Sequence, residues 1–219
     1  LSDATAHPHF YRVVPSDAIQ GDAMADMVAA SGVTNPALIH MTNAYGAGLA
    51  DSFESFWTGM NNSLCTKLGY EDTATDFSAA VQAVIDAGCD SAVLASYSAD
   101  GAMIIETMAA LGATIPTFGA DGIAGESALN DYTNPAVANG VQVTYPRAAS
   151  AGSGDFSTTC AADDVCGSGI YTLEAYDAVM MIGHAAMMED GANMATHLDM
   201  VGVDYNGESG VLTFLDNGD

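Results

Sequence analysis

Positive charge is almost absent from the sequence. Arg12, Lys67 and Arg147 are the three basic residues, against 28 acidic ones, and the formal net charge is −25. Phosphate contacts need clustered Lys and Arg, so the sequence excludes nucleic-acid binding and argues against attachment to anionic membrane surfaces. The acids are scattered, which predicts a surface adapted to salty water; steering of cationic ligands is the functional alternative.

Long apolar runs are missing too. Apolar residues make up 49% of the chain, but no run reaches the roughly 18–20 residues of a membrane-spanning helix. The sequence begins without Met and without the basic and apolar segments of a signal peptide. We therefore expect a mature or trimmed product with no direct membrane insertion, which leaves secretion open.

Motifs of enzymes and cofactor sites are absent as well. The sequence has no G-x-x-x-x-G-K-[ST] loop and no G-x-S-x-G elbow. His7 and His9 share the segment "HPH" but lack a carboxylate or third ligand for a metal. His184 stands in the Met-rich segment "MMIGHAAMM" and is interpreted as a satisfied core residue. The sequence thus predicts no enzyme, no metal site and no cofactor.

Four cysteines are present, an even number that suits disulfides in an oxidising compartment. Cys160 and Cys166 bracket "CAADDVC", which is too wide for a C-x-x-C redox motif and is interpreted as a small disulfide-bonded loop. Cys65 opens one predicted strand and Cys89 precedes another, so both lie near the same edge of a sheet. These two either form a disulfide or remain buried free thiols.

Strands and helices alternate through residues 37–145. Short apolar runs predict strands at 37–41, 63–69, 91–97, 115–122 and 140–146, and helical spacing of apolar residues marks segments between them. Such alternation predicts an α/β fold with a parallel, doubly wound sheet that is covered on both faces.

The segments before and after this alternating region differ from it. A helix is predicted from Asp17, with Gln20 as its capping-box partner, and its buried stripe is Ile19, Ala23, Met27 and Ala30. After Pro146 we expect a loop over 147–168 and then a helix over 169–189. That helix is apolar nearly all round and is expected to be buried on several sides. The tail, 205–219, predicts one strand between two turn signals.

The segment "NAYGAG" (43–48) follows the first of these strands. It resembles the start of a G-x-G-x-x-G dinucleotide loop, but Asp51 occupies the third small position and would repel a pyrophosphate. We interpret its glycines as a tight turn that places Tyr45 at a ligand site. Ligands of open parallel sheets bind beyond the carboxyl ends of the strands, where Tyr97 and Asp121 also stand. Two phenols and a carboxylate suit a small amine-bearing solute; the alternative for Asp121 is a simple Asp-Gly turn.

Six segments, in order, resemble the periplasmic solute-binding proteins of branched-chain amino-acid ABC transporters, of the leucine/isoleucine/valine-binding type. No single segment is specific, but together they span nearly the whole chain. They are "FYRVVPSDAIQG" (10–21), "NAYGAGLADSF" (43–53), "TDFSAAVQAVIDAGCDSAVLASY" (75–97), "PTFGADGI" (116–123), "YTLEAYDAVMMIGHA" (171–185) and "YNGESGVLTFLDNGD" (205–219).

The resemblance implies a type I periplasmic binding protein, in which two doubly wound α/β lobes clamp a solute. Family members are longer, and this chain resembles one truncated at both ends. Residues 13–145 would form the second lobe, and residues 1–12 with 146–219 would form crossovers and part of the first lobe. The groups that hold the solute carboxylate would lie in the part of the first lobe that is missing here.

By motif position, the resemblance implies that Tyr45, Tyr97 and Asp121 hold the amino acid, and that Tyr176 lines its side-chain pocket. Asp121 stands where familiar members have Glu, which puts the identity of the solute in doubt. The implied function is an extracytoplasmic, periplasmic receptor for a small amino acid that delivers it to ABC transporter membrane subunits. The alternatives are a ligand-binding sensor domain, or a receptor for amides, urea or aromatic acids on the same fold.

Overall fold

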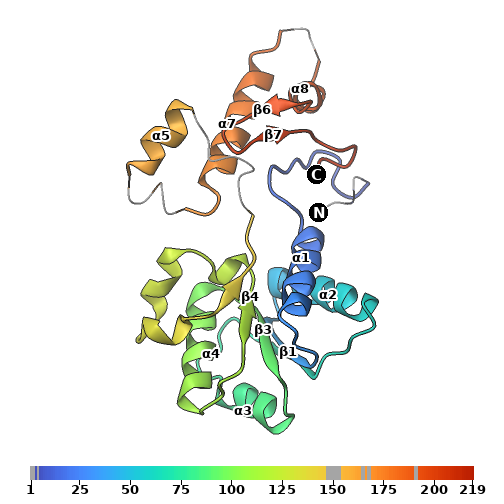
Figure 1. Cartoon of the computed structure of the whole chain (residues 1–219). Coiled ribbons are helices and arrows are strands. Elements are labelled where there is room, and N and C mark those ends of the chain that lie inside the picture. Colours follow the sequence, from blue (N-terminus) through green and yellow to red (C-terminus); the bar gives the residue numbers. More distant parts are fainter. Residues whose placement is uncertain (1–2, 4, 147–153, 164–165, 167–168, 190–191) are drawn as a thin grey trace. The chain divides into compact units, whose positions relative to one another are not determined.

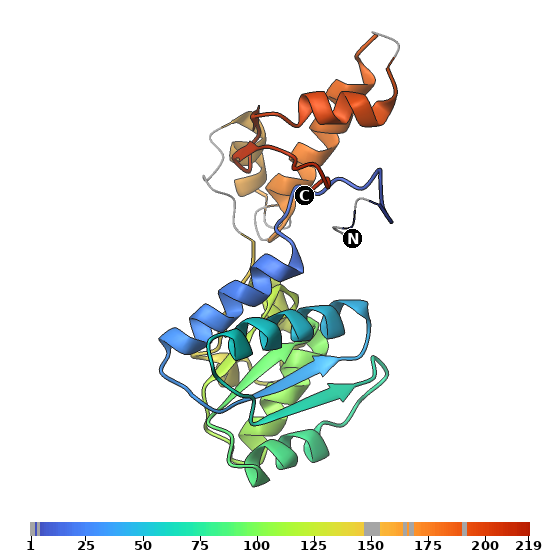
Figure 2. The same cartoon turned by 90° about the vertical axis from the view of Figure 1, so that its right-hand side faces the viewer.

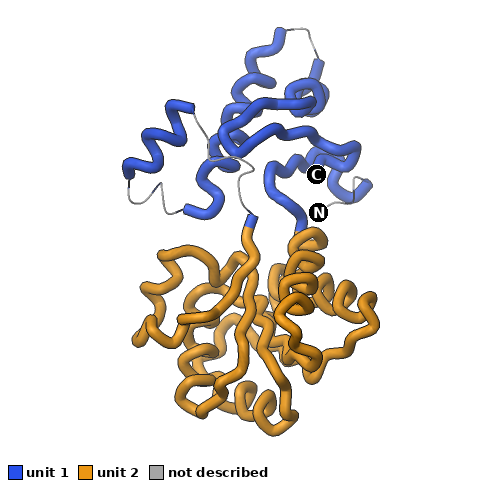
Figure 3. The backbone as a smooth tube through the Cα atoms, in the orientation of Figure 1, with its two compact units in different colours: residues 1–16, 146–219 blue, residues 17–145 orange. Residues whose placement is uncertain are grey.

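The computed structural model describes residues 3, 5–146, 154–163, 166, 169–189 and 192–219 (Figure 1). The chain divides into two compact units, which Figure 3 distinguishes by colour. Unit 2 comprises residues 17–145, and unit 1 comprises residues 1–16 together with 146–219. Arg147 lies outside the described residues.

Unit 2 alternates between helices and strands along its whole length. Its regular elements are α1 (Asp17–Ala30), β1 (Pro36–Met41), α2 (Ala44–Gly59), β2 (Thr66–Tyr70), α3 (Ser78–Asp86), β3 (Ser91–Ala95), α4 (Ser98–Ala110), β4 (Thr117–Gly119), the 3₁₀ helices η1 (Asp121–Ile123), η2 (Glu126–Asp131) and η3 (Pro135–Ala138), and β5 (Gln142–Val143).

The five strands of unit 2 form one parallel sheet in the order β2-β1-β3-β4-β5. Leu38 in β1 pairs with Lys67 in β2 on one side and with Val93 in β3 on the other. The chain runs from β1 outward to β2 at one edge of the sheet, and then crosses back over β1 to β3. From β3 it continues through β4 to β5 at the other edge, so the connections that follow β1 and β3 lead toward opposite edges. The predicted parallel, doubly wound α/β sheet is confirmed, and its switch point lies between β1 and β3.

Both faces of the sheet are covered by helices (Figure 2), as the continuous burial of β1 and β3 requires. One face packs against α1 and α2, and the other packs against α3 and α4. The first cluster is centred on Met24, Val28, Leu38, Leu49, Phe53, Trp57, Val93 and Phe118, and the second on Ile39, Phe77, Val81, Val84, Leu94, Ile104 and Met108.

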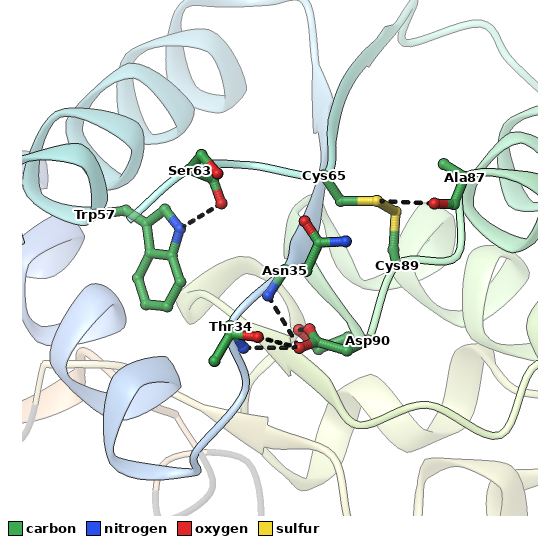
Figure 4. The surroundings of a disulfide bond; sticks show 9 residues. Thr34, Asn35, Trp57, Ser63, Cys65, Ala87, Cys89 and Asp90 are labelled. Atoms are coloured by element: carbon green, nitrogen blue, oxygen red, sulfur yellow. Dashed lines mark hydrogen bonds between the residues drawn. A yellow bond between two sulfur atoms is a disulfide. The ribbon is translucent and has the colours of Figure 1, made fainter. Parts of the chain in front are cut away.

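The segments just before the amino ends of the strands are held together by a disulfide and by hydrogen bonds (Figure 4). A disulfide joins Cys65 to Cys89, with 5.5 Å between their Cα atoms, which settles the alternative that the sequence left open. The Asp90 carboxylate accepts the backbone N–H groups of Thr34 at 2.7 Å and Asn35 at 2.9 Å. Burial favours the neutral carboxyl, but these hydrogen bonds outweigh it and hold the pKa of Asp90 below its usual value.

Two expectations for α1 are wrong. Its buried residues are Gly21, Met24, Ala25 and Val28, which lie on the opposite side of the helix from the predicted stripe, and Ile19 is 61% exposed. Gly21 sets this orientation, because a Cβ there would lie 2.9 Å from the Phe53 backbone nitrogen of α2. The Gln20 amide also does not cap the helix; it donates to the Thr144 carbonyl oxygen at 3.1 Å.

Unit 1 contains more regular structure than the sequence predicts. Its elements are α5 (Asp155–Ala161), α7 (Thr172–Ala186), α8 (Met194–Val201), β6 (Tyr205–Asn206) and β7 (Val211–Leu212). The helix α5 lies within the expected loop, where the hydroxyls of Ser157 and Thr158 bond to the Gly154 carbonyl. The predicted Cys160–Cys166 disulfide is present. In the tail, two short antiparallel strands replace the single one expected.

The helix α7 has an unexpected distribution of polarity. The sequence predicts burial on several sides, but Val179 is 68% exposed and Ile182 is 52% exposed. Its buried face instead includes Glu174 and Asp177, with Met181 and Ala185. Asp177 is fully buried because its carboxylate accepts the N–H groups of Glu208 and Ser209 and the Ser209 hydroxyl, at 2.6–2.8 Å.

Candidate ligand-binding site

The candidate site begins where β1 ends and α2 starts. The side-chain oxygen of Asn43 caps α2 by accepting the N–H of Gly46 at 2.9 Å. Gly46 allows α2 to start close behind β1, because a Cβ there would lie 2.5 Å from the Met41 carbonyl oxygen. Gly46 and Gly48 both lie inside the helix rather than in a tight turn, which corrects that interpretation. The result is that Tyr45 occupies the first turn of α2, directly beyond β1.

Tyr97 and Asp121 occupy equivalent places after the next two strands. Tyr97 occupies the N-cap position of α4 beyond β3, and Asp121 opens η1 beyond β4. The Tyr45 hydroxyl donates to Oδ1 of Asp121 at 2.9 Å and accepts the N–H of Gly122 at 3.1 Å. The rings of Tyr45 and Tyr97 stack, with centroids 4.9 Å apart and planes within 7°. The structure therefore brings together three of the four residues that the sequence singled out.

The backbone at Gly122 makes this close arrangement sterically feasible. A Cβ there would lie 2.8 Å from the Tyr45 hydroxyl oxygen and 2.4 Å from the Ser96 carbonyl oxygen. Asp121-Gly122 is thus more than a turn dipeptide, since the glycine lets the tyrosine hydroxyl reach the carboxylate. With Tyr97 47% exposed, the group presents an aromatic surface next to a carboxylate, a combination that can hold an ammonium group.

Another pair of a tyrosine and a carboxylate lies at the carboxyl ends of the strands. Tyr70 ends β2, and its hydroxyl donates to Oδ2 of Asp100 in the first turn of α4 at 3.3 Å. Burial raises the pKa of Asp100. Burial also raises the pKa of Tyr70; the Ser96 hydroxyl opposes this rise, and the Asp100 carboxylate adds to it. Asp100 was not predicted from the sequence, although its position three residues after Tyr97 was an available signal.

Tyr176 belongs to unit 1, whereas Tyr45, Tyr97 and Asp121 belong to unit 2. It lies on α7 and stacks on Phe156 of α5, with ring centroids 3.9 Å apart and planes within 10°. One face of the Tyr176 ring is therefore covered by a neighbour of the same unit. Its proposed contact with a solute stays a prediction.

The basic and imidazole side chains of the described chain take other positions. Lys67 binds Asp51 at 2.6 Å and Glu54 at 2.7 Å, and Arg12 pairs with Asp219. His184 is exposed and tilts against Tyr205, so its interpretation as a core residue is wrong.

Metal sites and membrane-spanning helices are two further features that the described residues could have carried. No group of three or more His, Cys, Asp or Glu side chains within them has the geometry to hold a metal ion. Within the same residues, no helix combines the length and the apolar character that crossing a bilayer requires.

Comparison with known proteins places the chain in a family. The family model described as the receptor family ligand binding region matches residues 1–219. The chain belongs to this family. A search of curated proteins finds no match.

Solved structures extend the likeness. The leucine-binding protein LivK of Thermotoga maritima has a TM-score of 0.81 at 20% identity, over 95% of this chain and 61% of that one. A solute-binding protein from R. palustris in complex with benzoate scores 0.80 at 13% identity, over 100% and 61%. LivJ of Streptococcus pneumoniae in complex with isoleucine scores 0.76 at 20% identity, over 94% and 60%. These likenesses show the fold, and the chain spans about 61% of the length of such relatives.

Proposed function

We propose that this chain is the ligand-binding part of an extracytoplasmic receptor for a small amino acid of the branched-chain or aliphatic type. The observation that carries the proposal is the convergence of Tyr45, Tyr97 and Asp121 beyond the ends of β1, β3 and β4. The group stands at the switch point of a 2-1-3-4-5 sheet, where ligands of doubly wound folds bind. Relatives of the same fold hold leucine and isoleucine.

Each side chain has a distinct role in this proposal. The Asp121 carboxylate neutralises the α-ammonium group of the solute, and the Tyr45 hydroxyl fixes the orientation of that carboxylate. The exposed ring of Tyr97 provides an apolar surface for the solute. No covalent chemistry is required of any of them, so we propose a receptor rather than an enzyme.

The test is the substitution Asp121→Asn, with affinity for L-leucine and L-isoleucine measured by isothermal titration calorimetry. We expect binding to weaken by about 1.5–3 kcal/mol, which is the contribution of a hydrogen bond to a charged group. The matched control is Asp199→Asn in unit 1, where Oδ1 accepts the Tyr11 hydroxyl at 2.7 Å in a similar tyrosine–aspartate pair. Equal affinity of the Asp121 variant and the wild type would contradict the role of Asp121.

An aromatic acid is the second candidate solute, because one relative of this fold is bound to benzoate. The stacked rings of Tyr45 and Tyr97 suit an aromatic solute. The Asp121 carboxylate opposes it, since like charges repel in a partly buried site. Benzoate titrated into wild type and Asp121→Asn distinguishes the two: tighter benzoate binding by the variant, with no leucine binding by either protein, favours the aromatic acid.

We further infer that unit 2 is the second lobe of the receptor, that unit 1 is part of the first lobe, and that Tyr176 contributes from that lobe. The exposed apolar side chains of α7 support this, because a lobe helix of a doubly wound fold normally packs against a sheet. The proposed location of the receptor is the periplasm, and its proposed partners are the membrane subunits of an ABC importer. A sensor domain on the same fold is the alternative. Leucine uptake by a reconstituted transporter would favour the transport receptor, and its absence would favour the sensor domain.

A further inference from the structure

The chain passes between the two units twice, at sites far apart in the sequence. It enters unit 2 between Ser16 and Asp17 and leaves it between Tyr145 and Pro146 (Figure 3). Each passage carries a proline at the boundary, namely Pro15 and Pro146. Proline fixes its own φ and restricts the residue before it, so the backbone is restricted at each of the two boundaries.

One side chain joins the two passages. Gln20, in the first turn and a half of α1, donates its amide N–H to the Thr144 carbonyl oxygen at 3.1 Å, and the same nitrogen lies 3.4 Å from the Thr144 hydroxyl. The two residues are 124 positions apart in the sequence. A single hydrogen-bonded contact inside unit 2 thus connects the beginning of the unit to its end.

Both ends of this link are held by the body of unit 2. Thr144 continues the line of β5 and donates its N–H to the Gly119 carbonyl of β4 at 3.0 Å. The start of α1 is fixed on α2, where the Ser52 hydroxyl donates to the Ala18 carbonyl at 3.5 Å and Gly21 packs against the same serine. The link therefore sets the spacing at which the two passages leave the unit.

We propose that Gln20 is a positioning residue of the hinge between the units, an inference that rests on the proposed function of a receptor that closes around its solute. With the link in place, the two passages leave unit 2 at a fixed separation and rotate together. Without it, the first turns of α1 and the end of β5 are no longer joined directly, so their separation varies more and the solute-free protein samples more arrangements. Closure then costs more conformational entropy, so affinity falls although no solute contact is lost.

The experiment compares Gln20→Met with wild type. Methionine keeps the length and packing of the side chain but cannot donate to Thr144. We expect a wider distribution of distances between spin labels placed through unnatural amino acids at the exposed positions Ala29 and Val203 in the solute-free protein. We also expect the Kd for L-leucine to rise about two- to tenfold, the equivalent of one hydrogen bond.

Two further variants separate hinge control from a general loss of stability. Gln82→Met is the matched control, because the Gln82 amide donates to Asp86 at 2.9 Å within α3, and it should leave the distance distribution and the Kd unchanged. Gln20→Lys restores a donor and should narrow the distribution again. Trp57, the single tryptophan, lies in the core of unit 2 and reports its thermal unfolding by fluorescence.

The outcomes also separate this inference from the proposed function. Identical distance distributions for wild type, Gln20→Met and Gln82→Met would overturn the role of Gln20. A lower unfolding temperature of unit 2 with an unchanged distribution would do the same, because it would show a purely structural contact. If wild type binds no amino acid, the proposed function fails, while the distance distributions still decide whether Gln20 controls the hinge.

Discussion

The two units of the chain are stabilised in different ways. Unit 2 has an apolar core on each face of its sheet. In the described part of unit 1, the buried apolar side chains are Cys160, Met181 and Ala185, while large apolar side chains such as Val179, Met187 and Val211 are exposed. Since apolar burial is the dominant stabilising contribution to folding, unit 2 has the means to fold by itself, whereas unit 1 relies on polar and covalent links.

The links that stabilise unit 1 include a disulfide and hydrogen bonds to carboxylates. Asp177 holds the β6–β7 turn through three hydrogen bonds, and the Cys160–Cys166 disulfide connects α5 to the segment before α7. The Tyr11 hydroxyl donates to Asp199, and burial together with that carboxylate raises the pKa of Tyr11 to about 12. A unit built in this way is sensitive to the loss of single polar groups and tolerant of changes at its exposed apolar face.

Removing one large core side chain from each unit gives the strongest contrast. Phe118→Ala in unit 2 should lower the free energy of unfolding by about 3–5 kcal/mol, because it leaves a cavity in a closely packed core. Met181→Ala in unit 1 should cost about 2 kcal/mol or less, at the low end for such substitutions, since few apolar side chains surround the site. Urea unfolding followed by Trp57 fluorescence measures the first, and hydrogen exchange along α7 measures the second. Equal costs would show that unit 1 has a core comparable to that of unit 2.

The disulfides provide a second contrast, with a somewhat smaller effect. Cys65 and Cys89 are separated by 24 positions, and Cys160 and Cys166 by six. Chain entropy predicts a loss of about 3–4 kcal/mol for Cys65→Ala/Cys89→Ala and about 2 kcal/mol for Cys160→Ala/Cys166→Ala. Trp57 fluorescence should report the first loss and remain unchanged in the second variant. A shift of the Trp57 transition in the Cys160/Cys166 variant would instead indicate that the two units unfold together.

The sequence predicted unit 2 better than unit 1 for a physical reason. Strands buried on both faces appear as short apolar runs, so β1 and β3 could be located within two residues of their observed bounds. The rule that ligands gather beyond the carboxyl ends of parallel strands then selected Tyr45, Tyr97 and Asp121, which the structure brings together. Periodicity failed at α1 because apolar residues lie on both sides of the helix, and the buried side, with Met24 and Val28, is the one on which Gly21 allows a close approach to α2.

Features held by polar groups left no periodic signal. The helix α5 consists largely of Ser, Thr and Ala near glycines, a composition typical of loops, and side-chain hydrogen bonds stabilise it. Asp177 is a charged residue on a largely apolar helix, and its burial is explained by its three hydrogen bonds in the folded chain. The Tyr70–Asp100 pair joins β2 to α4, which the sequence could not place side by side without the order of the strands.

The smallest expected effect concerns pH and again distinguishes the units. Glu174 of α7 is buried, and burial raises its pKa; a backbone hydrogen bond opposes the rise and the nearby Asp177 carboxylate adds to it. A carboxyl group with a raised pKa in the folded state contributes stability that is fully present below its unfolded pKa of about 4.3 and is lost as pH rises through the folded pKa. Unit 1 should therefore become more stable as pH falls from 7 toward that value.

The substitution Glu174→Gln isolates this contribution from the general effect of the net charge of −25. It should slow hydrogen exchange in α7 at pH 7 and flatten the dependence of that exchange free energy on pH. The control Glu126→Gln removes an exposed glutamate of unit 2 and should leave α7 unchanged. If both variants shift the pH profile of α7 equally, long-range repulsion governs the pH response, and the buried carboxyl of unit 1 has no special part in it.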